Sequence, residues 1–144
     1  MKATVVATEL GPVSVLVERG KAVRILLGVY IQPAEFIDPF KKQLDEYFNG
    51  SRKILDFPVR IEGSRFQKRV WEIVRRIPYG AVITYGEIAK VLNTSPRAVG
   101  IALSKNLLPI YIPCHRVIAK DGLGGFSEGL AWKKFLLKVE GVVL

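Results

Sequence analysis

The chain has 144 residues, of which 49% are hydrophobic, and this is enough for one compact domain or for two small domains that share an interface. One cysteine and one histidine exclude an internal disulfide and make a zinc site of the Cys/His type improbable. The formal net charge of +9 favours a polyanionic partner, with nucleic acid ahead of an anionic membrane surface.

The first sixty residues predict a small α/β unit. Val- and Leu-rich runs separated by Gly-containing turns predict an antiparallel meander over residues 4–10, 13–18 and 23–29. Asp38-Pro39 predicts an N-cap followed by proline at the first helical position, and Asn49-Gly50 ends this helix. Residues 55–61 predict a further strand, which Pro58 places at an edge or a bulge. None of these residues is an obvious catalytic group.

From residue 63 onward the chain changes to short, basic helices. Ser64, with Gln67 three residues later, is typical of a capping box at the start of a helix. Apolar side chains recur at helical spacing after it, with Lys and Arg on the other side, so the helix is predicted to be amphipathic. Pro78-Tyr79-Gly80 ends it.

Two further short helices follow. Thr84 with Glu87 repeats the capping-box pattern, and Ser95-Pro96 forms an N-cap with proline at the first helical position. The spacing of these helices, which Asn93-Thr94 joins, is consistent with a helix-turn-helix or with a plain helical hairpin in a core.

The composition of the second of these helices favours the helix-turn-helix. Its exposed positions hold one long cation, Arg97, among small residues such as Ala98 and Gly100, and such a surface can approach a DNA backbone closely. Glycine costs about 1 kcal/mol relative to alanine inside a helix, which is easier to understand if something must pack against Gly100. The N–H groups at the start of the helix are also available to a phosphate.

The only cysteine follows in the segment Pro113-Cys114-His115-Arg116. A lone cysteine in an apolar run is usually an inert core residue. Here an imidazole and a guanidinium come directly after it, and both can help a thiol to lose its proton and become a nucleophile. Neighbouring residues in a strand point to opposite faces, so a bend or a water would be needed to pass the proton from Cys114 to His115. A cysteine protease is disfavoured, because that chemistry needs a separately placed histidine.

Three groups of residues in the second half carry a resemblance to a known family. They are Ile112-Pro113-Cys114-His115-Arg116-Val117; Arg97-Ala98-Val99-Gly100 with Asn106; and Gly124-Gly125-Phe126-Ser127 with Lys133 and Glu140-Gly141. With these motifs the chain resembles the O6-alkylguanine-DNA alkyltransferases, also called methylated-DNA-protein-cysteine methyltransferases, from about residue 66 to residue 141. The family's usual Asn-Pro-x-Pro is Asn-Leu-Leu-Pro here, and its usual Gly-Tyr is Gly-Phe, but no reacting group is missing.

The resemblance implies an α/β protein with two domains. Residues 1–62 would form a small N-terminal α/β domain of ribonuclease-H-like fold, and residues 63–144 a mostly helical winged helix-turn-helix domain. The implied activity is DNA repair by direct damage reversal, in which guanine O6 of a flipped base gives up its alkyl group, such as methyl, to Cys114. Each molecule acts once, because the thioether product has no leaving group. The implied partner is double-stranded DNA containing O6-alkylguanine, and we expect a monomer with no cofactor and no metal.

The resemblance also implies roles for individual residues. On the catalytic side, His115 activates Cys114 through water, Glu140 orients His115, Tyr85 donates a hydrogen bond or a proton to the flipped base, and Asn106 braces the turn that carries the cysteine. On the substrate side, an arginine finger fills the space left by the base, small residues allow close approach to DNA, and polar residues lie near guanine O6. The substrate-side residues are Arg97, Ala98, Gly100, Arg116, Ser127 and Lys133.

Three other kinds of protein share some of these features. A non-catalytic alkyltransferase-like protein flips alkylated bases without a reactive cysteine, and the presence of Cys114 speaks against it. A winged-helix DNA-binding regulator leaves the Pro113-Cys114-His115-Arg116 segment unexplained, and a lipid-surface or protein-interaction domain would rest on charge alone. We expect no membrane association and a cytoplasmic location, because no apolar run is long enough to span a bilayer and no leader sequence is apparent.

Overall fold

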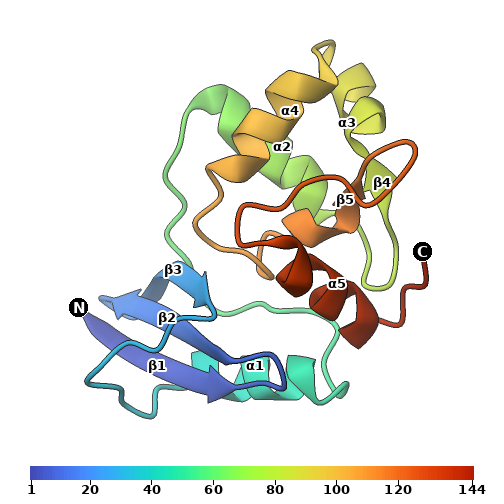
Figure 1. Cartoon of the computed structure of the whole chain (residues 1–144). Helices are drawn as coiled ribbons and strands as arrows, with labels where there is room; N and C mark the ends of the chain where they lie inside the picture. The colour runs from blue at the N-terminus through green and yellow to red at the C-terminus, as the bar shows by residue number, and fades with distance from the viewer. The chain divides into compact units, whose positions relative to one another are not determined.

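The computed structural model describes all 144 residues, and they form two compact units, Met1–Ile61 and Glu62–Leu144. Together the units make a mixed α/β fold (Figure 1). No helix combines the length and the apolar character that a membrane crossing needs.

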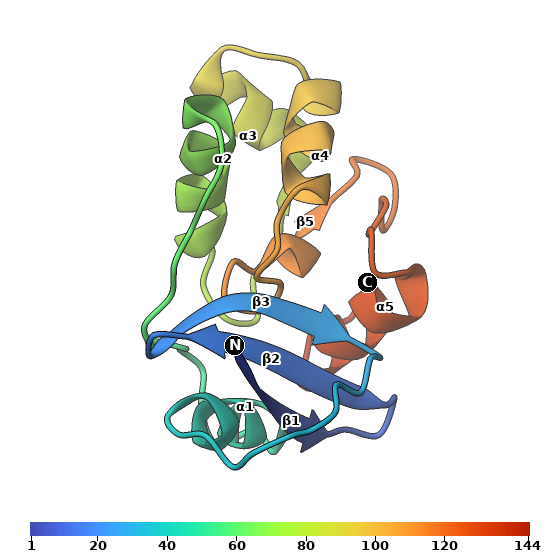
Figure 2. The ribbon, with the colours of Figure 1, turned by 90° about the vertical axis from the view of Figure 1, so that its left-hand side faces the viewer.

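The N-terminal unit is a three-stranded antiparallel sheet in the order β1-β2-β3, with one helix against it (Figures 1 and 2). Its elements are β1 (Lys2–Ala7), β2 (Pro12–Glu18), β3 (Lys21–Leu27) and α1 (Phe40–Phe48). Alternate valines of β2, at positions 13, 15 and 17, are buried, as the period of two in a strand requires. The predicted meander is confirmed.

Two predictions for this unit need correction. The N-cap of α1 is Pro39 and not Asp38, whose carboxylate instead accepts a hydrogen bond from the Lys42 N–H at 3.0 Å. The strand predicted for residues 55–61 is reduced to one parallel bridge between Val59 and Ala22. The bridge consists of two hydrogen bonds, from the Ala22 N–H to the Pro58 carbonyl at 2.9 Å and from the Arg60 N–H to the Ala22 carbonyl at 3.0 Å, and Pro58 has no N–H with which to extend it.

The C-terminal unit is mostly helical. Figures 1 and 2 show three of its helices packed together, with a short two-stranded parallel sheet and a last helix below them in these views. Its elements are α2 (Arg65–Arg75), β4 (Ile83–Thr84), α3 (Tyr85–Leu92), α4 (Pro96–Ser104), the 3-10 turn η1 (Cys114–Arg116), β5 (Val117–Ile118) and α5 (Leu130–Val139).

The helix starts follow the predicted caps. Ser64 and Gln67 form a complete capping box, since each side chain accepts the other residue's backbone N–H, at 3.1 and 2.9 Å. Ser95 caps α4 as predicted. Thr84 caps α3, but the box is only half made, because the Glu87 carboxylate accepts from the Thr84 hydroxyl at 3.2 Å and not from its backbone.

The core of this unit contains one anchor that the sequence pattern did not single out. Trp71 of α2 is 4% exposed, and its Nε1 donates to the carbonyl of Ala102 at 3.0 Å. This contact ties α2 to α4 at a buried point. It therefore fixes the helix that carries Arg97 at its other end.

Candidate active site

Cys114 lies at the start of η1, so the segment bends where a strand could have continued. The residue is 6% exposed, and the chain holds no other cysteine. The Asn106 amide donates to Cys114 Sγ at 3.3 Å and to the Ile112 carbonyl at 2.9 Å, while Asn106 Oδ1 accepts from the Leu108 N–H at 2.8 Å. The buried Asn106 side chain thus bonds to both ends of the loop between α4 and η1 and also to the sulfur.

His115, Arg116 and Glu140 form a buried cluster behind the cysteine. His115 Nε2 lies 2.6 Å from Glu140 Oε2, and the Arg116 guanidinium donates to both carboxylate oxygens, at 2.8 and 3.0 Å. The Gly80 N–H donates to the same carboxylate at 3.0 Å, and Arg116 also reaches the Ile77 carbonyl at 2.7 Å. A buried charge needs an opposite charge and hydrogen-bond partners, and Glu140 and Arg116 provide these for each other.

The cluster fixes the protonation state of His115. Burial lowers the pKa of its imidazole, although the hydrogen bond to Glu140 acts in the opposite direction, so the ring is neutral at neutral pH. A carboxylate can only accept, so Nε2 carries the proton and Nδ1 keeps its lone pair. His115 Nδ1 is buried and has no hydrogen-bond partner in the protein. Nδ1 is therefore the atom of this cluster that can accept a proton.

The Cys114 thiol is not preactivated in this structure. Burial, followed by the negative charge of Glu128, raises the pKa of the thiol to about 12, and Asn106 and Lys133 only partly oppose them. In the resting structure the His115 imidazole and the Arg116 guanidinium are both engaged with Glu140. The thiol therefore rests in its protonated form.

This resting state predicts a steep pH dependence for simple thiol chemistry. Because only the thiolate reacts and the pKa of Cys114 is raised to about 12, labelling of the native protein by iodoacetamide should speed up with no plateau through pH 9. Raising the pH by two units should give about a 100-fold increase in rate. Intact-mass measurement of labelling against time gives the rates, with the unfolded protein as the reference. A plateau below pH 9 would show that the thiol is activated at rest.

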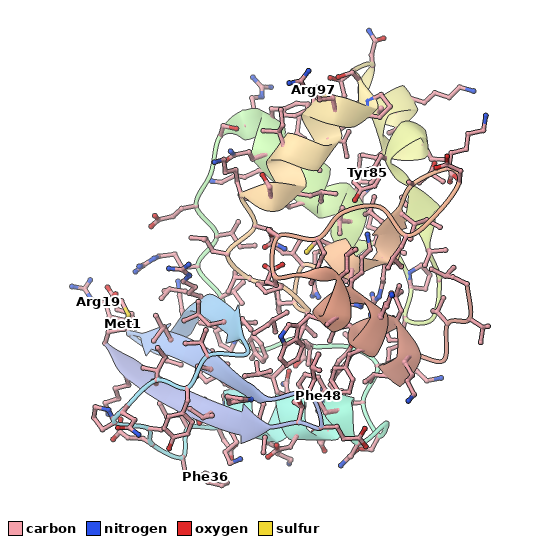
Figure 3. All side chains as sticks on the ribbon, in the orientation of Figure 1. Met1, Arg19, Phe36, Phe48, Tyr85 and Arg97 are labelled. Carbon is pink, nitrogen blue, oxygen red and sulfur yellow. The ribbon has the colours of Figure 1, made fainter.

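A cavity of about 700 Å³ opens beside the cysteine. It is lined by the thiol, by one face of α4, by Tyr85 at the start of α3 and by the segment that precedes α5, and Figure 3 labels Arg97 on α4 and Tyr85 on α3. Among its lining residues are Tyr85, Arg97, Gly100, Ile101, Cys114, Phe126 and Ser127. Its volume is within the range of pockets that hold small molecules. No group of three His, Cys, Asp or Glu side chains that could hold a metal ion is present.

The segment before α5 forms one wall of the cavity, and the Gly125 carbonyl in this wall accepts two side-chain hydrogen bonds. The Tyr85 hydroxyl donates to this oxygen at 3.2 Å, and the Lys133 ammonium donates to it at 2.9 Å and to the Val117 carbonyl at 2.7 Å. Gly124 has a φ of +75°, and a Cβ there would lie 2.8 Å from the Tyr85 ring, so only glycine fits. Burial lowers the pKa of Lys133 to about 8 and raises the pKa of Tyr85.

The structure brings most of the predicted site residues together, but some of them do not face the cavity. Arg116 is not placed to bind substrate, because its guanidinium is committed to Glu140 and its side chain is only 8% exposed. Lys133 is fully buried behind the wall, and Ala98 does not line the cavity. Gly100 does line it, and a Cβ there would meet nothing in the protein closer than 4.0 Å.

Sequence reasoning missed three participants. The Gly80 N–H and the Gly125 carbonyl are backbone groups, and no side-chain pattern marks them. Glu128 directly follows Ser127, and its partly buried carboxylate accepts from the Ser127 hydroxyl at 3.2 Å. Its position directly after Ser127, a predicted substrate-side residue, is the feature of the sequence that could have identified it.

Comparisons with known proteins agree on one family. The family model described as the DNA-binding domain of 6-O-methylguanine DNA methyltransferase matches residues 65–142. The methylated-DNA-protein-cysteine methyltransferase of Archaeoglobus fulgidus is 45% identical over 135 residues, 90% of this chain and 92% of that protein. The protein of the same name from Methanopyrus kandleri is 52% identical over 122 residues, 82% of this chain and 93% of that protein. A crystal structure of Mycobacterium tuberculosis OGT in complex with DNA is 32% identical, with a TM-score of 0.83 over 97% of this chain and 92% of that one. Sequence and structure thus agree along nearly the whole length, and the chain belongs to the methylated-DNA-protein-cysteine methyltransferase family.

Proposed function

We propose that this protein repairs DNA by transferring an alkyl group from guanine O6 to Cys114, once per molecule. The observation that carries the proposal is the position of the only cysteine in a cavity that Arg97 and Tyr85 also line. The relatives are named for methylated DNA, and the similar M. tuberculosis protein was solved with DNA, which supports double-stranded DNA as the partner. The net charge of +9 suits the same partner.

We propose that the N-terminal end of α4 faces the DNA. In this proposal α3 and α4 form a helix-turn-helix, and residues 63–144 form a winged domain around it. The two helices contact each other and are joined by Asn93, in a left-handed conformation, and the Ser95 cap. We assign residues 1–62 to a ribonuclease-H-like domain with no reacting group, and we expect a monomer. The damaged nucleotide must leave the stack to reach the buried sulfur, and Arg97, which is exposed, would occupy the vacated space.

The proposed chemistry is a single displacement at the alkyl carbon. The sulfur of Cys114 forms the new bond as the bond from carbon to guanine O6 breaks, and the thiol proton passes through water to His115 Nδ1. The electron pair that remains on the guanine needs a hydrogen bond or a proton, which Tyr85 can supply once its hydroxyl turns from the Gly125 carbonyl to the base. Ser127 lines the same cavity, but its hydroxyl donates to Glu128 in the resting structure.

The test is the intact mass of the protein after incubation with a duplex that carries O6-methylguanine. Transfer predicts a gain of one methyl group, at most one per molecule, and peptide mapping should locate it on Cys114. A duplex with undamaged guanine is the control. An unchanged mass with tight binding to the damaged duplex would favour the non-catalytic alkyltransferase-like alternative.

Arg97→Ala is expected to separate base flipping from chemistry. Flipping costs a few kcal/mol, so loss of the side chain that replaces the base should slow repair of duplex DNA by about tenfold or more. Reaction with free O6-benzylguanine needs no flipping and should keep its rate. Single-turnover rates on both substrates measure the difference, and Lys105→Ala at the C-cap of α4 is a charge-matched control. Equal loss on both substrates would contradict the finger role.

A further inference from the structure

The loop that carries Cys114 has a contact with α2 that the proposed chemistry does not use. Arg75, in the last turn of α2, donates through Nη1 to the Tyr111 carbonyl at 2.8 Å. The central carbon of its guanidinium lies 3.9 Å from the centroid of the Tyr111 ring. Both residues are partly buried. A guanidinium can donate hydrogen bonds and also stack on an aromatic face, so this one side chain contacts both the backbone and the ring of Tyr111.

The contact lies at the part of the loop that most needs support. Tyr111 is three residues before Cys114, and it follows Ile110, whose φ is +74°. A β-branched residue rarely adopts this conformation, so contacts with the surroundings must hold the loop in it. Asn106 supplies such contacts from one end of the loop, and Arg75 supplies one from a neighbouring helix. The backbone that leads to the sulfur is therefore held from two directions.

The same helix also holds α4. Trp71 lies one turn before Arg75 on α2, and its indole N–H donates to the Ala102 carbonyl of α4 at 3.0 Å. Residues four positions apart are neighbours on one face of a helix. Through these two side chains, α2 holds both the helix that bears Arg97 and the loop that bears Cys114, and it fixes one relative to the other.

We propose that Arg75 is a positioning residue for alkyl transfer, which keeps the Cys114 sulfur in line with the alkyl carbon through its contacts with Tyr111. The inference rests on the proposed function, because it concerns the reaction of the same cysteine. A misplacement of the reacting atoms by about 1 Å can slow a reaction by about 100-fold. Arg75 does not line the cavity, so it acts through the loop and not on the substrate.

The experiment compares two reactions of Cys114 in the wild type and in Arg75→Met. Alkyl transfer needs the sulfur in its place, and its single-turnover rate is measured with saturating O6-methylguanine duplex and with free O6-benzylguanine. Labelling by iodoacetamide needs only an exposed sulfur. Transfer from both substrates should fall by about tenfold in the variant. Labelling should instead become about threefold faster or more, because a loosened loop exposes a sulfur that is buried at rest.

Two further variants make the result specific. Arg75→Lys keeps a positive charge and a donor but not the planar guanidinium, so its transfer rate should fall less, and it replaces Arg75→Met if that variant does not fold. Arg76→Met removes the same kind of side chain from the exposed C-cap of α2 and should leave the O6-benzylguanine and labelling rates unchanged. Thermal unfolding shows whether each variant is folded at the assay temperature.

Opposite changes in transfer and labelling support the proposal, because a purely structural role would leave both rates of the folded protein unchanged. Wild-type rates in folded Arg75 variants, with only the unfolding temperature lowered, would overturn it and leave the proposed function standing. A loss of transfer confined to the duplex would also overturn it, since Arg75 would then act on the DNA. If the wild type transfers no alkyl group from either substrate, the proposed function fails and this inference fails with it.

Discussion

Cys114→Ala is expected to abolish alkyl transfer while leaving the protein folded and bound to damaged duplex DNA. The remaining nucleophilic atoms of the cavity lining are the hydroxyls of Tyr85, Ser104 and Ser127, which are far weaker nucleophiles than a thiolate. Removing one sulfur atom costs the protein only a small cavity and one hydrogen bond from Asn106, about 1 to 2 kcal/mol. We expect the proposed DNA-facing surface of α4 to be unaffected by loss of the sulfur.

Three measurements check this expectation: intact mass after incubation with O6-methylguanine duplex, affinity for the same duplex by fluorescence anisotropy, and thermal unfolding. Cys114→Ser is the matched control, because its hydroxyl keeps a partner for Asn106 and should also fail to accept the methyl group. A methyl gain in Cys114→Ala would identify another acceptor and refute the central assignment. Loss of binding in both variants would mean that the cysteine holds the DNA-binding surface in place.

Much of the secondary structure was predictable, because its signals are local. The capping box of Ser64 and Gln67 and the cap at Ser95 depend on residues three positions apart, and both appear as predicted. The failures have non-local causes. Residues around Pro58 look like a strand, but how far they pair depends on which edge the folded sheet offers. Trp71 anchors α2 to α4 through a carbonyl 31 residues away, which no helical spacing reveals.

In the candidate site, too, local features were predictable and non-local contacts were not. The position of Cys114 after Arg97 and Asn106 could be read from the motifs, and the structure joins Asn106 to the sulfur. The motifs do not show which groups a charged side chain contacts in the folded protein. Arg116 is two residues from the nucleophile but is bound entirely within the protein. The loop before the cysteine also contains Ile110 at a φ of +74°, a conformation that β-branched residues rarely adopt, and only the packed loop imposes it.

Glu140→Ala is expected to cause a large loss of stability. The carboxylate receives hydrogen bonds from His115, from two nitrogens of Arg116 and from the Gly80 N–H, and its side chain is fully buried. Without it the Arg116 guanidinium stays buried with the Ile77 carbonyl as its remaining hydrogen-bond acceptor and the Tyr79 ring beside it. Breaking a buried pair by removing one member costs about 3 to 5 kcal/mol, a large part of the 5 to 15 kcal/mol that usually stabilises a folded protein. Urea unfolding measures the loss, and Glu72→Ala on the exposed face of α2 should change stability little.

Glu140→Gln separates the structural role of the carboxylate from its role in proton transfer. The amide has the same size but only one acceptor oxygen, so it cannot serve His115, Arg116 and Gly80 together, and an intermediate loss of stability follows. It also removes the negative charge that supports a proton on the imidazole, so His115 becomes a weaker base. Transfer measured well below the unfolding temperature should therefore fall by about tenfold or more even where the variant is fully folded. A folded Glu140→Gln protein with the wild-type rate would show that His115 does not take the thiol proton, and the route would have to begin at another base.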